Sequence, residues 1–482
     1  MKSRALNTSI MAGLTGAAVV FLVMLASVPK TSAIPAFSRK YQTSCTTCHN
    51  NYPELNDFGE AFKKNGFKFP KDDETFVKEP PVLLGSKAQK EAFPGAVYPG
   101  EIPGFLPIAF RYEGNFTLNR KQPAGFIAQN GFTPRTDLFA PNTFTIISAG
   151  SFGQNLSFWI DDDISVDAAN ASGAMGDGWL KYSDLGHGIG LPKNALNVRF
   201  GQFELDLPFT QAKSIYLSPF DIYNEAAIGP AGTTTNNPVI FGSTQRGIEF
   251  GGTPNNGNFD WSVAVVNGNN TGDVVRSSKD VYVRLSQKFN LERDPESRNA
   301  IQAAGPTGPR DHTSIRLGFY YYYGKNQQNQ GGPTAIVGIP TIEEPFYRVG
   351  GDLRFKYRHL ELFGLGMFGH DDNHAIVGGA LTTAPAVKFS GGFAGANYWF
   401  YPWLIGTFHY DAVNSSVDSL NGNPASQYQT RNRFSPGFQV LARANIKVVG
   451  EYQYTFGQPY TVGGTTLFFR PNTFQAGIDY VF

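Results

Sequence analysis

The sequence is short of residues on which several protein classes depend. Two cysteines in 482 residues exclude a scaffold held by several disulfides. Lys and Arg number 40 against 39 Asp and Glu, so no excess of positive charge points to nucleic-acid binding. Mean hydropathy is −0.25, which excludes a polytopic helical membrane protein, because such a chain needs several apolar runs of about 20 residues.

Aromatic residues and glycine are plentiful, whereas charge is scarce. Charged residues make up 16% of the chain, below the soluble average of about 25%. Aromatic residues make up 14%, with 41 Phe and 22 Tyr, and there are 54 Gly. This combination, without long apolar runs, favours a large β structure with an unusual surface.

The first 33 residues have the pattern of an export signal. Lys2 and Arg4 precede an apolar stretch over residues 10–28, and small residues up to Ala33 fit a cleavage site. We therefore expect residues 1–33 to be a signal peptide, with an uncleaved anchor as the alternative. Either way, the rest of the chain is expected to work outside the cytoplasm.

Both cysteines fall in the pentapeptide Cys45-Thr46-Thr47-Cys48-His49, the attachment signature of c-type haem. Two thiols at this spacing reach the two vinyl groups of one haem, and the next imidazole ligates its iron. The alternative is a disulfide or metal site beside a chance histidine. The sequence thus predicts one covalent haem c, attached through Cys45 and Cys48, with His49 as the proximal iron ligand.

A small α-helical haem domain is expected over residues 34–70. Pro53 suits a first helical position, and Gly66 suits the end of the helix. Leu55, Phe58 and Phe62 would form one apolar stripe beside the haem. Residues 71–104 mix Pro, Gly and charge, and we expect a linker there.

The haem domain lacks an obvious second axial ligand. Between residues 34 and 104 there is no Met, and His49 is the single His. A second ligand must come from elsewhere in the chain, from a donor such as Lys or the new α-amine, or be absent. The candidates elsewhere are His187, His312, His359, Met175, Met367, His370, His374 and His409.

Residues 105–482 alternate apolar and polar side chains in segments of about ten residues, the pattern of a transmembrane β-barrel. A soluble β-sandwich or propeller also alternates, but its strands are usually about 5–6 residues long. The chain ends on Phe482, which resembles the insertion signal of outer-membrane barrels. We therefore predict a mainly β protein, with an antiparallel barrel of about 16 strands in the bacterial outer membrane.

The predicted strands centre near sixteen positions, and the connections between them alternate in length. Short turns are expected near residues 154, 358, 401 and 444, and long external loops at 120–141, 206–239, 324–345, 369–386 and 412–430. Both termini then lie in the periplasm. The long connection 291–312 departs from this alternation. The strand centres are 112, 147, 160, 181, 200, 246, 262, 285, 318, 351, 364, 393, 407, 437, 451 and 475.

A sixteen-stranded barrel encloses a water-filled channel unless something plugs it. Arg348, Arg354 and Lys356 would face this lumen and could favour anions. The plainer interpretation is a solvated wall whose charge Asp352 balances. The haem domain is small enough to fit in such a lumen, whereas the whole segment 34–104 is not.

Two stretches resemble known families. The segment Ile34 to Gly66, with the haem pentapeptide, Leu55-Asn56 and Phe58-Gly59, is similar to the haem segment of fused monohaem cytochrome–porins of iron-oxidising bacteria. Residues 199–203, with Pro208-Phe209, resemble a strand of phosphate-selective-type porins. The motif likeness covers about 35 residues, and the likeness in architecture covers nearly the whole chain.

The resemblance implies an outer-membrane electron-transfer protein. It would pass electrons from an extracellular donor, Fe(II) in the characterised branch of the family, to a periplasmic carrier such as a soluble c-type cytochrome. Asp371, Asp372 and His374 are candidates for collecting Fe(II), since carboxylates and imidazoles suit that ion, although a solvated loop also explains them. The alternatives are a solute or anion porin whose haem segment is a plug, and a redox sensor on a barrel anchor.

Overall fold

The computed structural model describes most of the chain after residue 35. The main described ranges, with shorter described pieces between some of them, are 36–69, 73–95, 100–122, 134–153, 155–164, 174–210, 215–224, 244–254, 258–268, 278–291, 313–328, 342–377, 380–415, 432–455 and 472–482.

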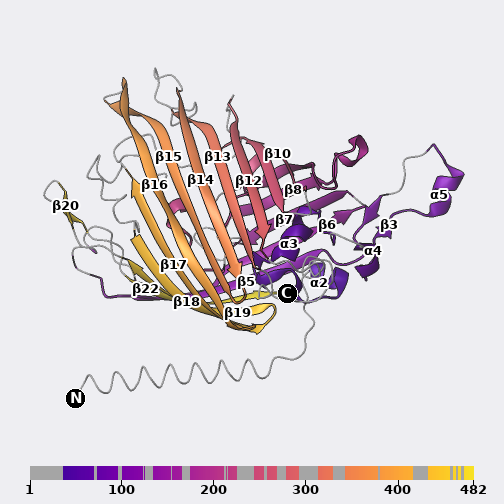
Figure 1. Ribbon diagram of the computed structural model, residues 1–482, viewed down its shortest axis with the longest axis horizontal. Coiled ribbons are helices and arrows are strands. Elements are labelled where there is room, and N and C mark those ends of the chain that lie inside the picture. Colours follow the sequence, from indigo (N-terminus) through magenta and orange to yellow (C-terminus); the bar gives the residue numbers. More distant parts are fainter. Residues whose placement is uncertain are drawn as a thin grey trace, which may run out of the picture.

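Sixteen antiparallel strands close into one barrel, which confirms the predicted fold class. Each strand pairs with its neighbours in the sequence, and β22 pairs with β5 to close the ring (Figure 1). The strands are β5 Ile108–Asn119, β6 Thr136–Phe152, β7 Leu156–Ile164, β8 Ala174–Tyr182, β9 Asn197–Phe203, β10 Gln245–Gly252, β11 Phe259–Val266, β12 Asp280–Asn290, β13 Ser314–Gln328, β14 Ile342–Tyr357, β15 Leu360–Val377, β16 Ala380–Tyr401, β17 Leu404–Ser415, β18 Asn432–Arg443, β19 Ile446–Thr455 and β22 Thr473–Val481.

The alternation along each strand separates a lipid face from a lumen face. On β12, Tyr282, Arg284 and Lys288 are buried inside the barrel, whereas Leu285 and Phe289 are exposed on its outside. This inversion, with charge inside and apolar side chains outside, is what a hydrocarbon solvent requires. The strand period of two therefore sets which residues can form a site in the lumen.

Exposed aromatic residues lie near both ends of the strands. Tyr357, Tyr398 and Trp403 lie near one set of turns, and Tyr410 and Tyr454 lie towards the other. Aromatic belts at two levels are typical of outer-membrane barrels, and the even number of antiparallel strands agrees with them. The protein is thus a porin-like barrel of the bacterial outer membrane, in contact with its lipid. Among the described residues, no helix is both long enough and apolar enough to cross a bilayer.

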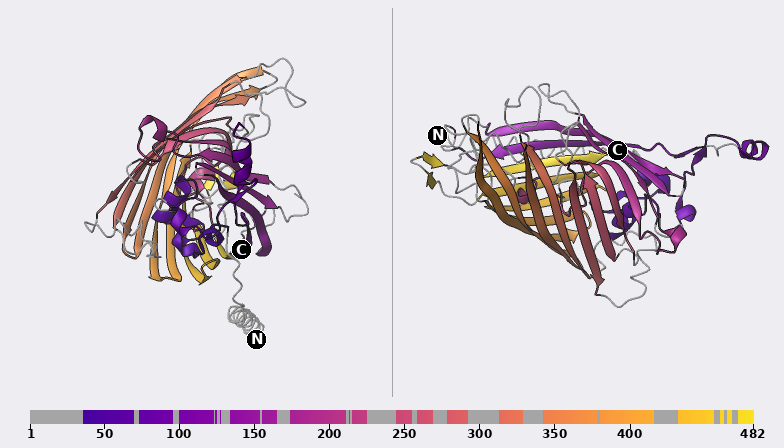
Figure 2. Two further views of the ribbon diagram at one scale, coloured as in Figure 1. Left: turned by 90° about the vertical axis from the view of Figure 1, so that its right-hand side faces the viewer. Right: turned by 90° about the horizontal axis from the view of Figure 1, so that it is seen from above.

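Residues 36–69, which we call the kernel, fold into a small unit that lies inside the barrel (Figure 2). Its aromatic side chains share one buried core with lumen-facing residues of the wall. Its elements are α2 Ala36–Tyr41, the 3-10 turn η1 Cys45–Thr47, β1 His49–Asn51, β2 Glu54–Leu55 and α3 Asp57–Lys64.

A segment with short elements lies between the kernel and the barrel in the sequence. The segment carries apolar side chains that are largely exposed, among them Leu84 and Phe93. It extends well away from the barrel in Figure 1. Its short elements are α4 Asp73–Phe76, β3 Val82–Leu83, α5 Lys87–Ala92 and β4 Glu101–Ile102.

A second segment enters the lumen between β9 and β10. Residues 204–224, which we call the inward segment, end in the short helix α7 Asp221–Asn224. Leu205, Ile215 and Phe220 of this segment are almost fully buried. The sequence predicted an external loop over 206–239, so the described part of that loop folds inward instead. Outside the barrel ladder, the remaining elements are the turn η2 His187–Ile189 and a hairpin of β20 Tyr460–Val462 with β21 Thr465–Leu467.

Two other local expectations were wrong. The long loop predicted at 369–386 is mostly strand, because β15 and β16 continue to pair up to Val377 and Ala380. Pro53 lies in the turn between β1 and β2, and Asn56 instead caps the helix that follows. Gly66 does end that helix, with a positive φ of 69°. Most of the connection 291–312 lies outside the described residues.

Candidate functional site

The two cysteines lie at the ends of one tight turn of the kernel. The Ser44 side chain caps this turn by accepting a hydrogen bond from the Thr46 amide. The Cys48 amide donates to the Cys45 carbonyl at 3.2 Å, which brings the two residues one turn apart. His49 follows at once as the first residue of β1.

Helix α3 is held tightly against this turn. The Asn56 side chain accepts from the Gly59 amide at 2.9 Å and donates to the Thr47 carbonyl at 3.1 Å. At Gly59 a Cβ atom would lie 2.0 Å from the Cys48 carbonyl oxygen. A side chain at this position is therefore excluded, and the absence of one lets the helix reach the turn that carries the cysteines.

An aromatic shell surrounds the turn from both the kernel and the barrel. Within the kernel, Tyr41 stacks on Phe69, and Phe62 meets both rings edge-on. From the barrel wall, Trp159 on β7 and Trp179 on β8 each lie 5.8 Å, centroid to centroid, from Phe67. The kernel and the barrel therefore build one continuous apolar environment.

A cavity of about 550 Å³ opens beside this shell, within the 300–1,000 Å³ typical of cofactor sites. Cys45, Cys48 and His49 all line it, as does the apolar face of the kernel. Trp159 and Trp179 line it from the barrel side. Two thiols, one imidazole and an aromatic wall on one cavity are the donor set and the surroundings that a covalent haem needs. The residues present therefore fit the group that the pentapeptide predicts.

The His49 ring is oriented by the backbone. Its Nδ1 lies 3.2 Å from the Pro53 carbonyl oxygen, which can only accept a hydrogen bond. Nδ1 must therefore carry the proton, and Nε2 keeps its lone pair. Burial lowers the pKa of His49 to about 4, which keeps the imidazole neutral at physiological pH. A neutral ring whose Nε2 keeps its lone pair is the form that ligates a metal ion.

The pKa values of the two thiols are raised, whereas that of His49 is lowered. Burial raises the pKa of Cys45, and burial followed by the nearness of Cys45 raises the pKa of Cys48 to about 12. Both therefore remain protonated thiols near neutral pH. Such cysteines are poor metal ligands and weak nucleophiles by themselves.

The structure places the candidates for a second axial ligand away from this cavity. Among the described residues, none of the predicted His or Met candidates lines it. The His409 ring is bound to Asp411 and Ser218, and His359 Nδ1 lies 2.9 Å from the Trp399 carbonyl oxygen. Residue 312 and the side chain of residue 374 lie outside the described part. Donor groups that do line the cavity include those of Tyr41, Tyr52, Lys63, Lys64, Lys181 and Lys213.

In the structure, Asp371 and Asp372, two of the residues expected to collect Fe(II), interact with other side chains. Asp371 is buried and makes a two-point contact with Arg348, so its carboxylate is already occupied. Asp372 accepts from His370 Nε2 at 2.9 Å. In the described part of the chain, no group of three or more His, Cys, Asp or Glu side chains could hold a metal ion.

The predicted basic strip in the lumen is neutralised by carboxylates. Arg348 pairs with Asp371, and Arg354 Nε lies 3.0 Å from Glu361. Lys356 lies 3.6 Å from a carboxylate of the kernel, that of Asp57. The strip is therefore not a free anion path, and Asp352 instead binds Arg284.

Comparisons with known proteins bear on the barrel. No protein-family model matches the sequence, and no curated protein matches it. Among solved structures, it is similar to the outer-membrane channel DcaP of Acinetobacter baumannii, with 15% identity over 78% of this chain and 96% of the other, and a TM-score of 0.44. It is also similar to OmpF of Salmonella typhi in complex with daunomycin, with 11% identity, 78% and 98% coverage and a TM-score of 0.46.

An anion-selective porin from Comamonas acidovorans is similar at 13% identity, with 78% of this chain and 98% of that chain covered and a TM-score of 0.48. At these identities and TM-scores, the likeness gives no conclusion about what this barrel transports. The kernel and its cavity must therefore be judged on their own residues.

Proposed function

We propose that this outer-membrane barrel carries one covalently attached haem and passes electrons between an extracellular donor and a periplasmic carrier. One observation supports this most: Cys45, Cys48 and His49 line a single cavity of cofactor size, and that cavity lies inside the barrel. A redox group held on the membrane surface would be separated from one side by about 30 Å of hydrocarbon. A group held in the lumen shortens that separation.

Each residue of the site has a separate task in this proposal. Cys45 and Cys48 would hold the haem through thioether bonds, and His49 Nε2 would ligate its iron. Such a group supplies one-electron redox chemistry at a fixed place. The Pro53 carbonyl oxygen keeps the His49 ring in the ligating tautomer. Phe67, packed against the barrel tryptophans, keeps water away from that side of the cavity.

The donor we propose is Fe(II), with a soluble c-type cytochrome as the periplasmic carrier. The support for both is the resemblance of the kernel sequence to fused cytochrome–porins. The protein would act on Fe(II) as an oxidase, taking one electron from each ion and returning Fe(III) outside the cell. That location keeps ferric precipitates out of the periplasm.

The test is an anaerobic absorption spectrum of the purified, detergent-held protein before and after adding Fe(II). The proposal expects a c-type spectrum whose ferrous bands appear promptly with Fe(II). Cys45→Ser combined with Cys48→Ser is the matched control and should lose the covalent spectrum. If dithionite reduces the haem and Fe(II) does not, then Fe(II) is not the electron donor. No c-type spectrum at all would remove the redox function.

The second candidate is a solute porin in which the kernel is a plug. The observation in its favour is the porin-like barrel itself, with sixteen strands and the inward segment in its lumen. Single-channel recording with the full-length protein separates the two functions. Steady solute-sized conductance with the kernel in place would favour the porin, whereas a closed barrel with a reducible haem would favour the electron carrier.

A further inference from the structure

The kernel spans the lumen from one side of the barrel to the other. Phe67 packs on β7 and β8, whereas Asp57 reaches β12 and β14. In the closed strand order, β7 and β14 lie on opposite sides of the ring. Lys447 on β19 also donates to the Tyr52 carbonyl oxygen, so a third part of the wall holds the same unit. A folded unit held on several sides leaves little of the cross-section open.

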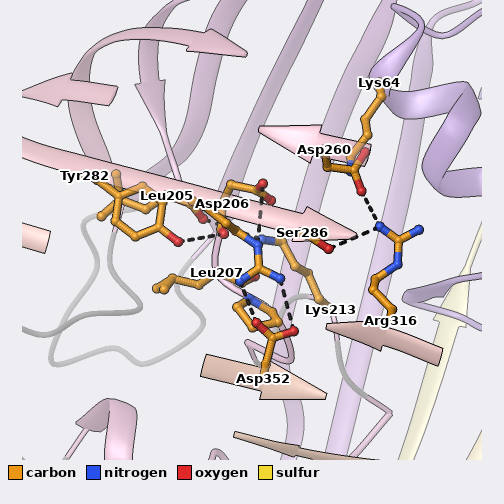
Figure 3. A network of polar contacts seen from close by, with 12 residues as sticks. Lys64, Leu205, Asp206, Leu207, Lys213, Asp260, Tyr282, Ser286, Arg316 and Asp352 are labelled. Carbon is orange, nitrogen blue, oxygen red and sulfur yellow. Dashed lines mark hydrogen bonds and ion pairs between the residues drawn. The ribbon is translucent and has the colours of Figure 1, made fainter. Parts of the chain in front are cut away.

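Two contacts at opposite ends of helix α3 set the position of the kernel. At the first residue of the helix, the Asp57 carboxylate pairs with Lys288 Nζ and lies 3.6 Å from Lys356 Nζ. At its last residue, Lys64 Nζ lies 2.7 Å from Asp260 Oδ1 (Figure 3). From its first residue to its last, this helix of eight residues rises about 10 Å along its axis.

The partners form one continuous charged patch on the lumen wall. Asp260, Lys288 and Lys356 come from β11, β12 and β14. Arg316, on the intervening strand β13, pairs with Asp260 (Figure 3). The three partners of the kernel are nearly buried, with side chains 5–6% exposed. Contacts of this kind are screened much less by salt than surface ion pairs.

The charges that the kernel contributes to the two contacts have opposite signs, so helix α3 fits the wall in only one direction. The kernel offers an acid to barrel lysines at one end of α3, and a lysine to a barrel acid at the other. A reversed helix would bring Asp57 against Asp260 and Lys64 against Lys288, and like charges in a lumen are costly. The pKa of Asp57 reflects its contacts with the basic side chains of the wall. Burial raises its pKa, but Lys356, Lys288 and Arg316 outweigh burial and hold the pKa well below its usual range.

We propose that Asp57 and Lys64 form a two-way charge lock that holds the kernel in the lumen as a plug, so that opening the lock makes the barrel conduct ions. This proposal does not depend on Fe(II) or on electron transfer. It assigns a positioning role to two residues outside the haem-attachment turn.

The experiment compares three full-length variants in planar lipid bilayers. Asp57→Lys reverses the charge that faces the barrel lysines. Asp57→Lys combined with Lys288→Asp restores an opposite pair with its signs exchanged. Lys325→Glu is the control, because it reverses a charge in an ion pair with Glu343 that does not involve the kernel.

We expect Asp57→Lys to raise the open probability at least about tenfold, the change that 1.4 kcal/mol of docking free energy produces. Amide hydrogen exchange over residues 57–66 should become faster in the same variant. The exchanged pair should return both readings towards those of the natural protein, and Lys325→Glu should leave them unchanged. Heat-modifiable migration on gels confirms that each barrel is folded.

Three results would overturn the proposal. Unchanged hydrogen exchange in a folded Asp57→Lys barrel would show that Asp57 does not hold the kernel in place. Faster hydrogen exchange without added conductance would show that the kernel is not what closes the barrel. Failure of the exchanged pair to restore a closed barrel would show that the two residues do not act through each other. Loss of the haem spectrum in all variants would instead count against the electron-transfer function and leave these readings valid.

Discussion

At the scale of single residues, the site depends on close approaches that leave no room for larger side chains. Gly59 is the clearest case, because a Cβ there would meet the Cys48 carbonyl oxygen at 2.0 Å. We predict that Gly59→Ala pushes α3 away from the attachment turn and lowers covalent haem content. The ratio of haem absorbance to protein in the purified chain measures this.

The control for this substitution is Gly95→Ala. An added Cβ at Gly95 has nothing within 4 Å, so its haem content should match that of the natural protein. Equal haem content in the Gly59 and Gly95 variants would contradict the tight packing of α3 on the turn.

The sequence alone predicts the residues of the attachment turn and leaves their neighbours undefined. The spacing in Cys45–His49 is local information, so no fold is needed to find it. The Pro53 carbonyl that orients the His49 ring cannot be found this way, because backbone contacts leave no composition signal. The wall residues Trp159 and Trp179 face the lumen by strand alternation, but alternation does not tell that both meet the kernel.

At the scale of elements, a buried polar network fastens the inward segment to the wall. Arg433 on β18 lies 2.8 Å from the Asp221 carboxylate and 3.7 Å from that of Asp411. The Asp221 amide donates to Asp411, and the Ser218 hydroxyl lies 3.1 Å from His409 Nε2. All these side chains are almost fully buried.

We predict that Arg433→Leu loosens the inward segment, because it removes the guanidinium that pairs with the buried Asp221 carboxylate. Removing one partner of a buried pair typically costs about 3–5 kcal/mol. Hydrogen exchange over residues 215–224 should become faster. Arg443→Leu, at the exposed end of the same strand, is the matched control, and similar exchange in both variants would show that Arg433 holds nothing in place.

The charge lock of helix α3 gives a pH dependence whose sign follows from Asp57. Its pKa is depressed in the folded protein, so its stabilising contribution is present above its ordinary value of 3.8 and is lost as pH falls through the lowered one. We predict that the kernel stays docked at about pH 4 and leaves only in stronger acid.

Tryptophan fluorescence across an acid titration should report this change, since Trp159 and Trp179 contact the kernel. Asp57→Asn has no carboxylate to protonate and should lose the acid transition attributed to this residue. An identical titration in both proteins would assign the transition to another group.

Strands are easier to predict than loops, for a physical reason. A barrel strand shows its alternation within about ten residues, and all sixteen predicted centres lie within observed strands. The direction of the inward segment depends on partners such as Arg433 and His409, some two hundred residues away, so its local sequence resembles an external loop. The prediction of a loop over 369–386 failed because the polar residues there resemble loop signals, whereas β15 and β16 pair through them.

At the scale of the whole molecule, the ring closes where the last strand meets the first. The Phe482 amide donates to the Phe110 carbonyl at 2.8 Å, and its own carbonyl accepts from the Phe110 amide. The two rings lie 5.4 Å apart, centroid to centroid. We predict that Phe482→Ala lowers the yield of folded, heat-modifiable barrel, because it removes packing at this seam. Phe289→Ala removes an exposed ring from β12, away from the seam, and should fold normally. Equal yields of the two variants would show that packing at the seam has no special role.

The kernel lies inside a ring that is built entirely from later parts of the chain. The connection from residue 70 to residue 107 can extend over ~120 Å at about 3.3 Å per residue. That reach lets the kernel fold while it is still outside the barrel. Biogenesis can therefore proceed in either order at the level of topology, with no threading of a chain end. The folding of the kernel and the closure of the barrel around it are thus coupled only through one long connecting length of polypeptide.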